Sequence, residues 1–176
     1  MPLMCLRRGI RAPQGRPAFI FCPLFFLGCY RPMTSTVLPE TPVKLKSVQF
    51  YSPFPPKKKG EKHFLKVEIM RKVDAKAIVG GEKAIREQMG NKGFWKGSWR
   101  VENKKYSPLL KVNQVWTASG KCRTKVEMDE KPWSLGFVEE GGFFGKMDLE
   151  LLWGWSGNGI YGSTWITRKI IIEGFK

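Results

Sequence analysis

Apolar and polar residues alternate with a period of two over much of the chain beyond residue 62. Leu65, Val67 and Ile69 fall on one side of the pattern, with Lys66 and Glu68 on the other. Because successive side chains of a β-strand point to opposite faces, this alternation predicts a half-buried strand. By the same reasoning we expect further strands at residues 94–103, 110–117, 122–128, 133–139, 147–153 and 160–172, and an edge strand at residues 43–51.

Turn signals separate these segments at Ser119-Gly120, Lys131-Pro132, Gly141-Gly142 and residues 156–159. Their spacing predicts an antiparallel meander of seven or eight strands. Such a meander can form a barrel, a curled sheet or a sandwich, because each of these arrangements removes or protects exposed strand edges. The fold class that we expect is therefore mainly β, with residues 61–176 as a single domain.

The only helical pattern that we identify covers residues 74–89, with Asp74 as its N-cap. Gly80 and Gly81 interrupt this pattern. Because glycine costs about 1 kcal/mol in a helix interior, we expect two short helical turns in place of one continuous helix.

The chain contains two short glycine motifs. Residues 157–162 match G-x-G-x-x-G, but a β-branched run follows where a nucleotide fold needs a helix, so we expect a hairpin turn here. The Gly93-to-Trp99 stretch, after a short helix, resembles the Gly-x-Trp entry of lipocalin-type barrels. That resemblance implies that Arg168, late in the final strand, covers a tryptophan.

Both sides of the final strand pattern are apolar. If Trp153 and Trp155 face the core, the neighbouring final strand must expose large apolar side chains on its outer face, and Tyr161 and Trp165 are among the candidates. An exposed patch of this kind marks an interface or a ligand cavity, and the alternative is a sheet covered on both faces.

Lys and Arg number 31 and Asp and Glu 15, giving a net charge of +16 that calls for an anionic partner. Residues 40–60, with their prolines and three consecutive lysines, predict an extended, exposed arm, which is either a solvated linker or a segment that lies across that partner. The candidate partner-binding residues are Lys57, Lys58, Lys59, Lys104, Lys105, Lys121, Arg123, Lys125, Tyr161 and Trp165.

The chain offers little for catalysis or metal binding. It has a single histidine, His63, at a strand edge, and its acidic residues read as ordinary loop charge, so we expect no catalytic residue, no metal site and no cofactor. Asp148 and Glu150 share a strand face, but no pocket can be recognised around them. Cys122 is the one cysteine beyond residue 39, and by alternation we expect it to be an inert core thiol.

The first 39 residues read as a cleaved targeting presequence. They contain five arginines and no acidic residue, with an apolar run at residues 18–30 that is too short to span a bilayer. Gly28-Cys29 followed by Tyr30-Arg31-Pro32 resembles the cleavage junction of bipartite plastid presequences in algae with complex red-type plastids. The resemblance implies cleavage near 29/30 and a location in the plastid stroma. The mitochondrial matrix, secretion and a true start at Met33 are the alternatives.

Three functional hypotheses follow. The first is a non-catalytic accessory subunit of a large organellar assembly, on the stromal side of a thylakoid complex such as a photosystem, where it contacts acidic protein surfaces and anionic lipids. The second is a single-stranded nucleic-acid-binding protein, in which exposed Trp and Tyr stack on bases. The third is a calycin-like barrel whose tryptophans line a pigment or lipid cavity.

Overall fold

The computed structural model describes residues 35–176 except 101–104 and 106. Residues 1–34 of the expected presequence and the candidate Lys104 therefore lie outside the described residues. The described part of the chain belongs to one compact unit.

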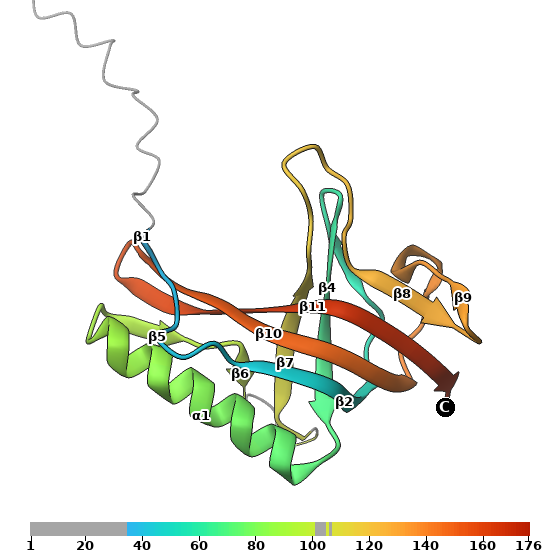
Figure 1. The fold of residues 1–176 in the computed structure, drawn as a ribbon, viewed down its shortest axis with the longest axis horizontal. Helices are drawn as coiled ribbons and strands as arrows, with labels where there is room; N and C mark the ends of the chain where they lie inside the picture. Colours follow the sequence, from blue (N-terminus) through green and yellow to red (C-terminus); the bar gives the residue numbers. More distant parts are fainter. Residues whose placement is uncertain (1–34, 101–104, 106) are drawn as a thin grey trace, which may run out of the picture. The chain divides into compact units, whose positions relative to one another are not determined.

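Over the residues described, the fold is mainly β, as predicted, with one helix (Figure 1). The strands are β1 (Ser35–Val37), β2 (Lys44–Ser52), β3 (Lys57–Lys59), β4 (Lys62–Ile69), β5 (Phe94–Lys96), β6 (Trp99–Arg100), β7 (Leu109–Gln114), β8 (Lys125–Met128), β9 (Lys131–Pro132), β10 (Phe143–Gly157) and β11 (Ile160–Phe175). The helix is α1 (Lys72–Met89), and a 3-10 turn, η1 (Leu135–Phe137), lies within residues 133–139, where we expected a strand.

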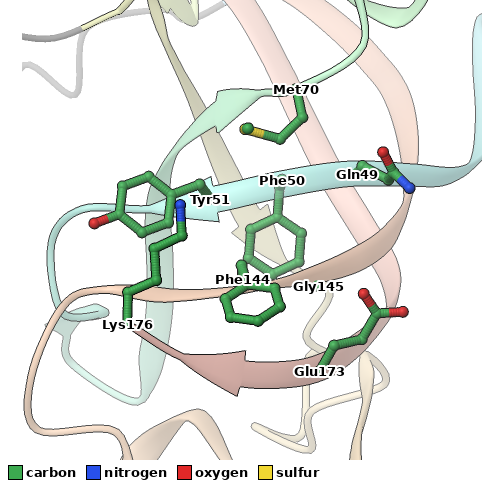
Figure 2. A pocket seen from close by; sticks show the side chains of 8 residues that line it. All are labelled: Gln49, Phe50, Tyr51, Met70, Phe144, Gly145, Glu173 and Lys176. Carbon is green, nitrogen blue, oxygen red and sulfur yellow. The ribbon is translucent and has the colours of Figure 1, made fainter.

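The eleven strands form one mixed sheet, so the prediction of a purely antiparallel meander is wrong. β11 runs parallel to β5, β7 and β8, and antiparallel to β10. β10 also pairs with β2, so it lies between β2 and β11 (Figure 2). β2 continues through β4 and β7 back to β11, which links segments far apart in the sequence.

β10 and β11 form the long hairpin that the turn signals predicted. Asn158 and Gly159 connect them, with φ of 51° and 71°. A two-residue turn with both φ values positive matches the right-handed twist of its flanking strands, and Asn-Gly is the pair that adopts it most readily. The G-x-G-x-x-G match is therefore a hairpin turn.

A register shift between Leu151 and Trp153 interrupts the alternation of β10. Beyond it Gly154 is buried, whereas Trp153 and Trp155 are half-buried. The condition that both tryptophans face inward is therefore not met. A bulge changes which side of the strand is covered, and alternation alone cannot reveal its position.

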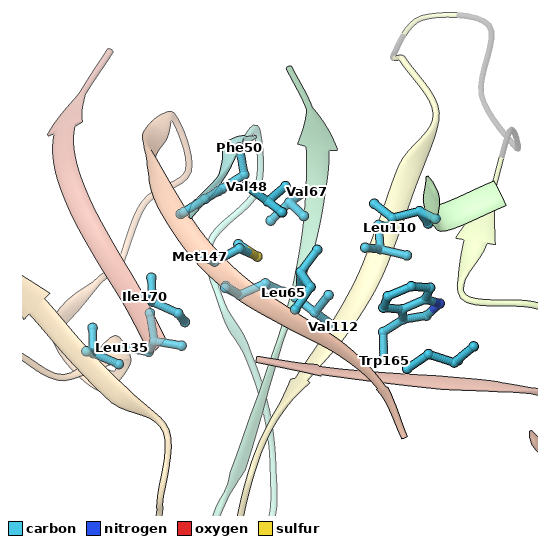
Figure 3. Close-up of a cluster of buried hydrophobic side chains, with 14 of the residues drawn as sticks. Val48, Phe50, Leu65, Val67, Leu110, Val112, Leu135, Met147, Trp165 and Ile170 are labelled. Atoms are coloured by element: carbon cyan, nitrogen blue, oxygen red, sulfur yellow. The ribbon is translucent and has the colours of Figure 1, made fainter. Parts of the chain in front are cut away.

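The hydrophobic core lies between β2, β4, β7, β10 and β11 (Figure 3). Leu65 and Val67 of β4 and Val112 of β7 meet Met147 of β10 and Ile170 of β11 there, all at most 1% exposed. The strand β4 follows the predicted alternation. Leu65 and Val67 therefore point into the core, and Lys66 lies on the outer side.

Helix α1 is continuous over 18 residues, so the predicted interruption is wrong. A Cβ on Gly81 would lie 3.3 Å from Val43 Cγ2 and 3.4 Å from Trp165 Cζ2, which shows how closely the helix approaches the sheet at this point. Packing against the sheet offsets the low helix propensity of glycine. Asp74 lies within the first turn and pairs with Arg71 at 2.6 Å, and it is not the N-cap.

The predicted Pro/Lys-rich arm at residues 40–60 is also corrected. Most of it belongs to the sheet: β2 pairs with β4 and β10, and β3 forms a hairpin with β4. The three lysines of β3 are exposed, as expected, but the strand holds them in a fixed register in place of a free arm.

Candidate polyanion-docking face

Cationic side chains gather on the outer side of β3, β4, β6 and β7. Residues opposite one another in an antiparallel pair share a face, so Lys59 lies with Lys62, and Lys66 lies with Lys111. Arg100 of β6 lies opposite Leu109 of β7 on the same side. We call this surface the basic face; its members are Lys57, Lys59, Lys62, Lys66, Lys96, Arg100 and Lys111, together with Phe64.

Lys111 occupies the centre of the basic face. Its backbone N–H donates to the carbonyl of Ser98 at 2.9 Å, which holds the segment between β5 and β6 beside β7. Its ammonium lies 4.7 Å from the centre of the Phe64 ring. The ring attracts the cation through its π-face and limits the positions that the long side chain can take.

The electrostatic environment of Lys111 is unfavourable for a charge. Burial, and then the nearby charges of Arg100, Lys59, Lys96 and Lys66, hold the pKa of Lys111 below its usual value. Like charges placed opposite each other on neighbouring strands destabilise a sheet. The arrangement favours an anion that would neutralise several of these groups at once.

Of the nine candidate residues that the structure describes, it brings two, Lys57 and Lys59, together on this face. Lys58 points to the other side with His63. Lys121 and Arg123 lie in the exposed loop before β8, Lys125 lies opposite Lys169 in β8 and β11, and Lys105 lies in an exposed turn. These four are not part of the basic face.

Tyr161 and Trp165 are 3% and 0% exposed, so the expectation that they face a partner is wrong. Tyr161 packs edge-on against Trp95, with ring centres 5.1 Å apart. The indole N–H of Trp165 donates to Glu82 Oε1 at 2.8 Å. Helix α1 and the segment from β5 to β6 supply these contacts. Successive residues 161–163 and 165–167 are buried, so this end of β11 is covered on both faces, which is the alternative that the sequence left open.

Glu82 of α1 is the buried acid at the centre of this arrangement. Its Oε1 accepts from the backbone N–H of Ser98 at 3.2 Å, from the Ser163 hydroxyl and from Trp165. Among the residues that the structure describes, no Lys or Arg forms an ion pair with it. Burial raises the pKa of Glu82, and the hydrogen bonds from Ser163, Trp165 and the Ser98 and Trp99 backbone oppose this rise only in part.

Sequence reasoning missed Lys66, Lys111 and Glu82 as functional or structural centres. Lys66 was placed correctly on the outer side of its strand, but its partner across the sheet depends on the register of β4 and β7. Glu82 looks like an ordinary helix residue in the sequence. No local pattern signals either position, because both depend on contacts between segments distant along the chain.

Asp148, Glu150 and Arg168, which the sequence analysis considered as functional groups, form structural contacts. Asp148 Oδ1 accepts from the Ser47 backbone N–H at 2.9 Å, and Glu150 pairs with Arg168 at 3.0 Å. Arg168 therefore does not cover a tryptophan; Arg86 of α1 lies over Trp95 instead, 5.7 Å from the ring centre. In the described part of the chain, no group of three or more His, Cys, Asp or Glu residues could hold a metal ion.

Cys122 is exposed, and the prediction of a core thiol is wrong. It forms an isolated bridge with Trp116 in the turn that precedes β8, which begins only at Lys125. The alternation of β8 therefore does not extend back to this residue.

A pocket of about 240 Å³ lies where β2, β10 and β11 run side by side (Figure 2). Tyr51, Phe144 and Met70 form its apolar walls, and the Lys176 ammonium lies 4.6 Å from the centre of the Tyr51 ring. The pocket is smaller than typical ligand sites and no tryptophan lines it. It therefore does not have the tryptophan lining that the cavity hypothesis expected.

Among the described residues, no helix is long and apolar enough to cross a membrane. Comparison of the chain with protein-family models, with curated proteins and with solved structures gave no match.

Proposed function

We propose that this protein is a non-catalytic accessory subunit that docks through its basic face on an acidic surface of a larger organellar assembly. The observation that carries the proposal is the gathering of Lys59, Lys66, Lys96 and Arg100 around Lys111. Acidic side chains on a partner would relieve the mutual repulsion of these cations, and complementary charge would also speed association.

The location that we propose is the plastid stroma, with the partner on the stromal side of a thylakoid complex such as a photosystem. The arginine-rich leader and its plastid-like junction support this address. The mitochondrial matrix is the alternative. Fluorescence microscopy of the full chain, with a fluorescent protein fused after Lys176, tests it: signal outside both organelles would contradict the proposal.

The nucleic-acid hypothesis has less support. It relied on Tyr161 and Trp165 as exposed rings on which bases could stack, and both are buried. Phe64 is the aromatic residue of the basic face, and Lys111 already lies over its ring. The lysines alone favour a partner that offers charge without requiring stacked bases.

Blue-native electrophoresis after gentle solubilisation of the organelle tests the docking proposal. We expect the wild-type chain to co-migrate with a large complex and the Lys66→Glu/Lys111→Glu variant to migrate as a free small protein. Lys72→Glu/Lys76→Glu on the exposed side of α1 is the matched control with the same charge change, and it should still co-migrate. A wild-type chain found only as a free species, or equal loss in both variants, would refute docking through this face.

A further inference from the structure

The Lys66 and Lys111 pair is an unusual feature of the basic face. The two residues lie directly opposite each other on β4 and β7, on the outer side of the sheet. Among the described residues, neither forms an ion pair with an acid within 4.0 Å, whereas Lys44, Lys83, Lys146 and Lys169 elsewhere on the protein do. Glu68 is the acid closest along β4 on this face, yet it forms no ion pair with either lysine.

Neighbouring groups restrict the positions that the Lys111 ammonium can take. Phe64 lies beneath the Lys111 ammonium, and Arg100 Nε lies within 3.5 Å of the Gly97 carbonyl. These contacts place Lys111 and Arg100 near the segment that carries Lys96. A group held in place before binding loses less conformational freedom when an anion arrives.

We propose that Lys66 and Lys111, with Lys59, Lys96 and Arg100 around them, form a binding site for a phosphoryl group, carried by inorganic phosphate or a small soluble phosphomonoester. A phosphoryl dianion presents three acceptor oxygens and up to two negative charges, so it satisfies several ammonium and guanidinium donors together. A single carboxylate carries one charge and would leave one of the two lysines, Lys66 or Lys111, uncompensated. The lowered pKa of Lys111 is consistent with a site whose counter-charge arrives with its ligand.

This inference deepens the proposed function and rests on it for the role of the basic face: a bound phosphoryl group would compete with the acidic partner for the same lysines. The phosphate-binding proposal and the docking proposal can nevertheless be refuted independently. Phosphate binding is measured on the purified chain without a partner, and docking is measured by co-migration in the organelle extract.

Isothermal titration calorimetry of the purified full chain with sodium phosphate tests the site, with sodium chloride at equal ionic strength as the reference. We expect saturable binding by the wild type, and affinity lower by about tenfold or more in Lys66→Gln and Lys111→Gln, since each removes a charge-assisted hydrogen bond. Lys111→Arg should retain most of the affinity, and Lys76→Gln on α1 should match the wild type.

Thermal unfolding of the same proteins gives a second readout. Phosphate stabilises most proteins to some degree, so the relevant quantity is the shift of the wild type relative to that of Lys111→Gln, not the shift itself. Circular dichroism establishes that each variant is folded. Equal shifts in both proteins, or titration heats no larger than those with chloride, would overturn the proposal. Sedimentation with phosphatidic acid vesicles without any response to inorganic phosphate would also overturn it, and would assign the lysines to a membrane surface.

Discussion

Glu82 shows how one side chain can organise a region of the sheet. It lies on α1, and the donors to its carboxylate include Ser98, Ser163 and Trp165, which belong to two different segments that follow the helix. If Glu82 were truncated to Ala, these donors would lose their common acceptor in a buried place, at a cost of about 1–3 kcal/mol for each donor left unsatisfied. The acid therefore fixes α1 against β11.

The raised pKa of Glu82 leads to a prediction about pH. A carboxyl group whose pKa is raised by folding contributes stability that is complete below the pKa of the unfolded chain and is lost as the pH rises through the folded pKa. The variant Glu82→Gln keeps an acceptor oxygen but does not titrate. We therefore expect the wild type to lose free energy of unfolding relative to Glu82→Gln as the pH rises above the ordinary titration range of a glutamate carboxyl and through the raised pKa of Glu82.

Urea unfolding followed by tryptophan fluorescence at a series of pH values measures this difference. Glu140→Gln, at an exposed loop position, is the control and should follow the wild type throughout. If the free energies of the wild type and Glu82→Gln run parallel over the whole range, the ionisation of Glu82 is not linked to folding.

At the scale of elements, the two central glycines of α1 have opposite surroundings. A Cβ on Gly80 would meet nothing within 4 Å, whereas a Cβ on Gly81 would press against Val43 and Trp165. Gly80 therefore lowers the stability of the helix without improving its packing, whereas Gly81 allows the helix to approach the sheet closely.

This contrast predicts different effects for the same substitution. Gly80→Ala should raise the free energy of unfolding by about 1 kcal/mol, because alanine is the better helix former. Gly81→Ala gains the same propensity but crowds its neighbours, so it should be less stable than Gly80→Ala. Chemical denaturation of the two variants side by side decides the matter, and equal stabilities would show that Gly81 is not a packing position.

The elements also show what the sequence could predict. The strand at β4 and the Asn158-Gly159 turn depend on local patterns, and both were predicted. The parallel pairing of β11 with β7, the bulge in β10 and the continuity of α1 depend on contacts between distant segments, which no local pattern encodes. The same reason explains the site: Lys66 was placed on its outer side, but its position opposite Lys111 could not be foreseen.

At the scale of the whole molecule, the excess of positive charge acts on stability as well as on binding. With a net charge of +16, the folded chain brings cations closer together than the unfolded chain does, most evidently on the basic face. Self-repulsion of this kind weakens a compact state, and salt screens it over about 10 Å at 0.1 M ionic strength.

We therefore expect sodium chloride to raise the urea midpoint of the wild type between about 0.02 M and about 0.3 M, a range over which screening changes most. Lys111→Met removes the central charge and keeps contact with Phe64, so its midpoint at low salt should be higher and its salt response smaller. A midpoint that falls with salt would mean that attractive ion pairs outweigh the repulsion.

The central place of β11 also affects how the chain is made. β5, β7 and β8 all pair with β11, yet each of them is synthesised well before it. A chain that leaves a ribosome or an import channel with its N-terminus first must carry these strands with open edges until residues 160–172 follow. Unpaired edges invite aggregation, so the nascent protein is a natural client for a chaperone that shields strands until the final one arrives.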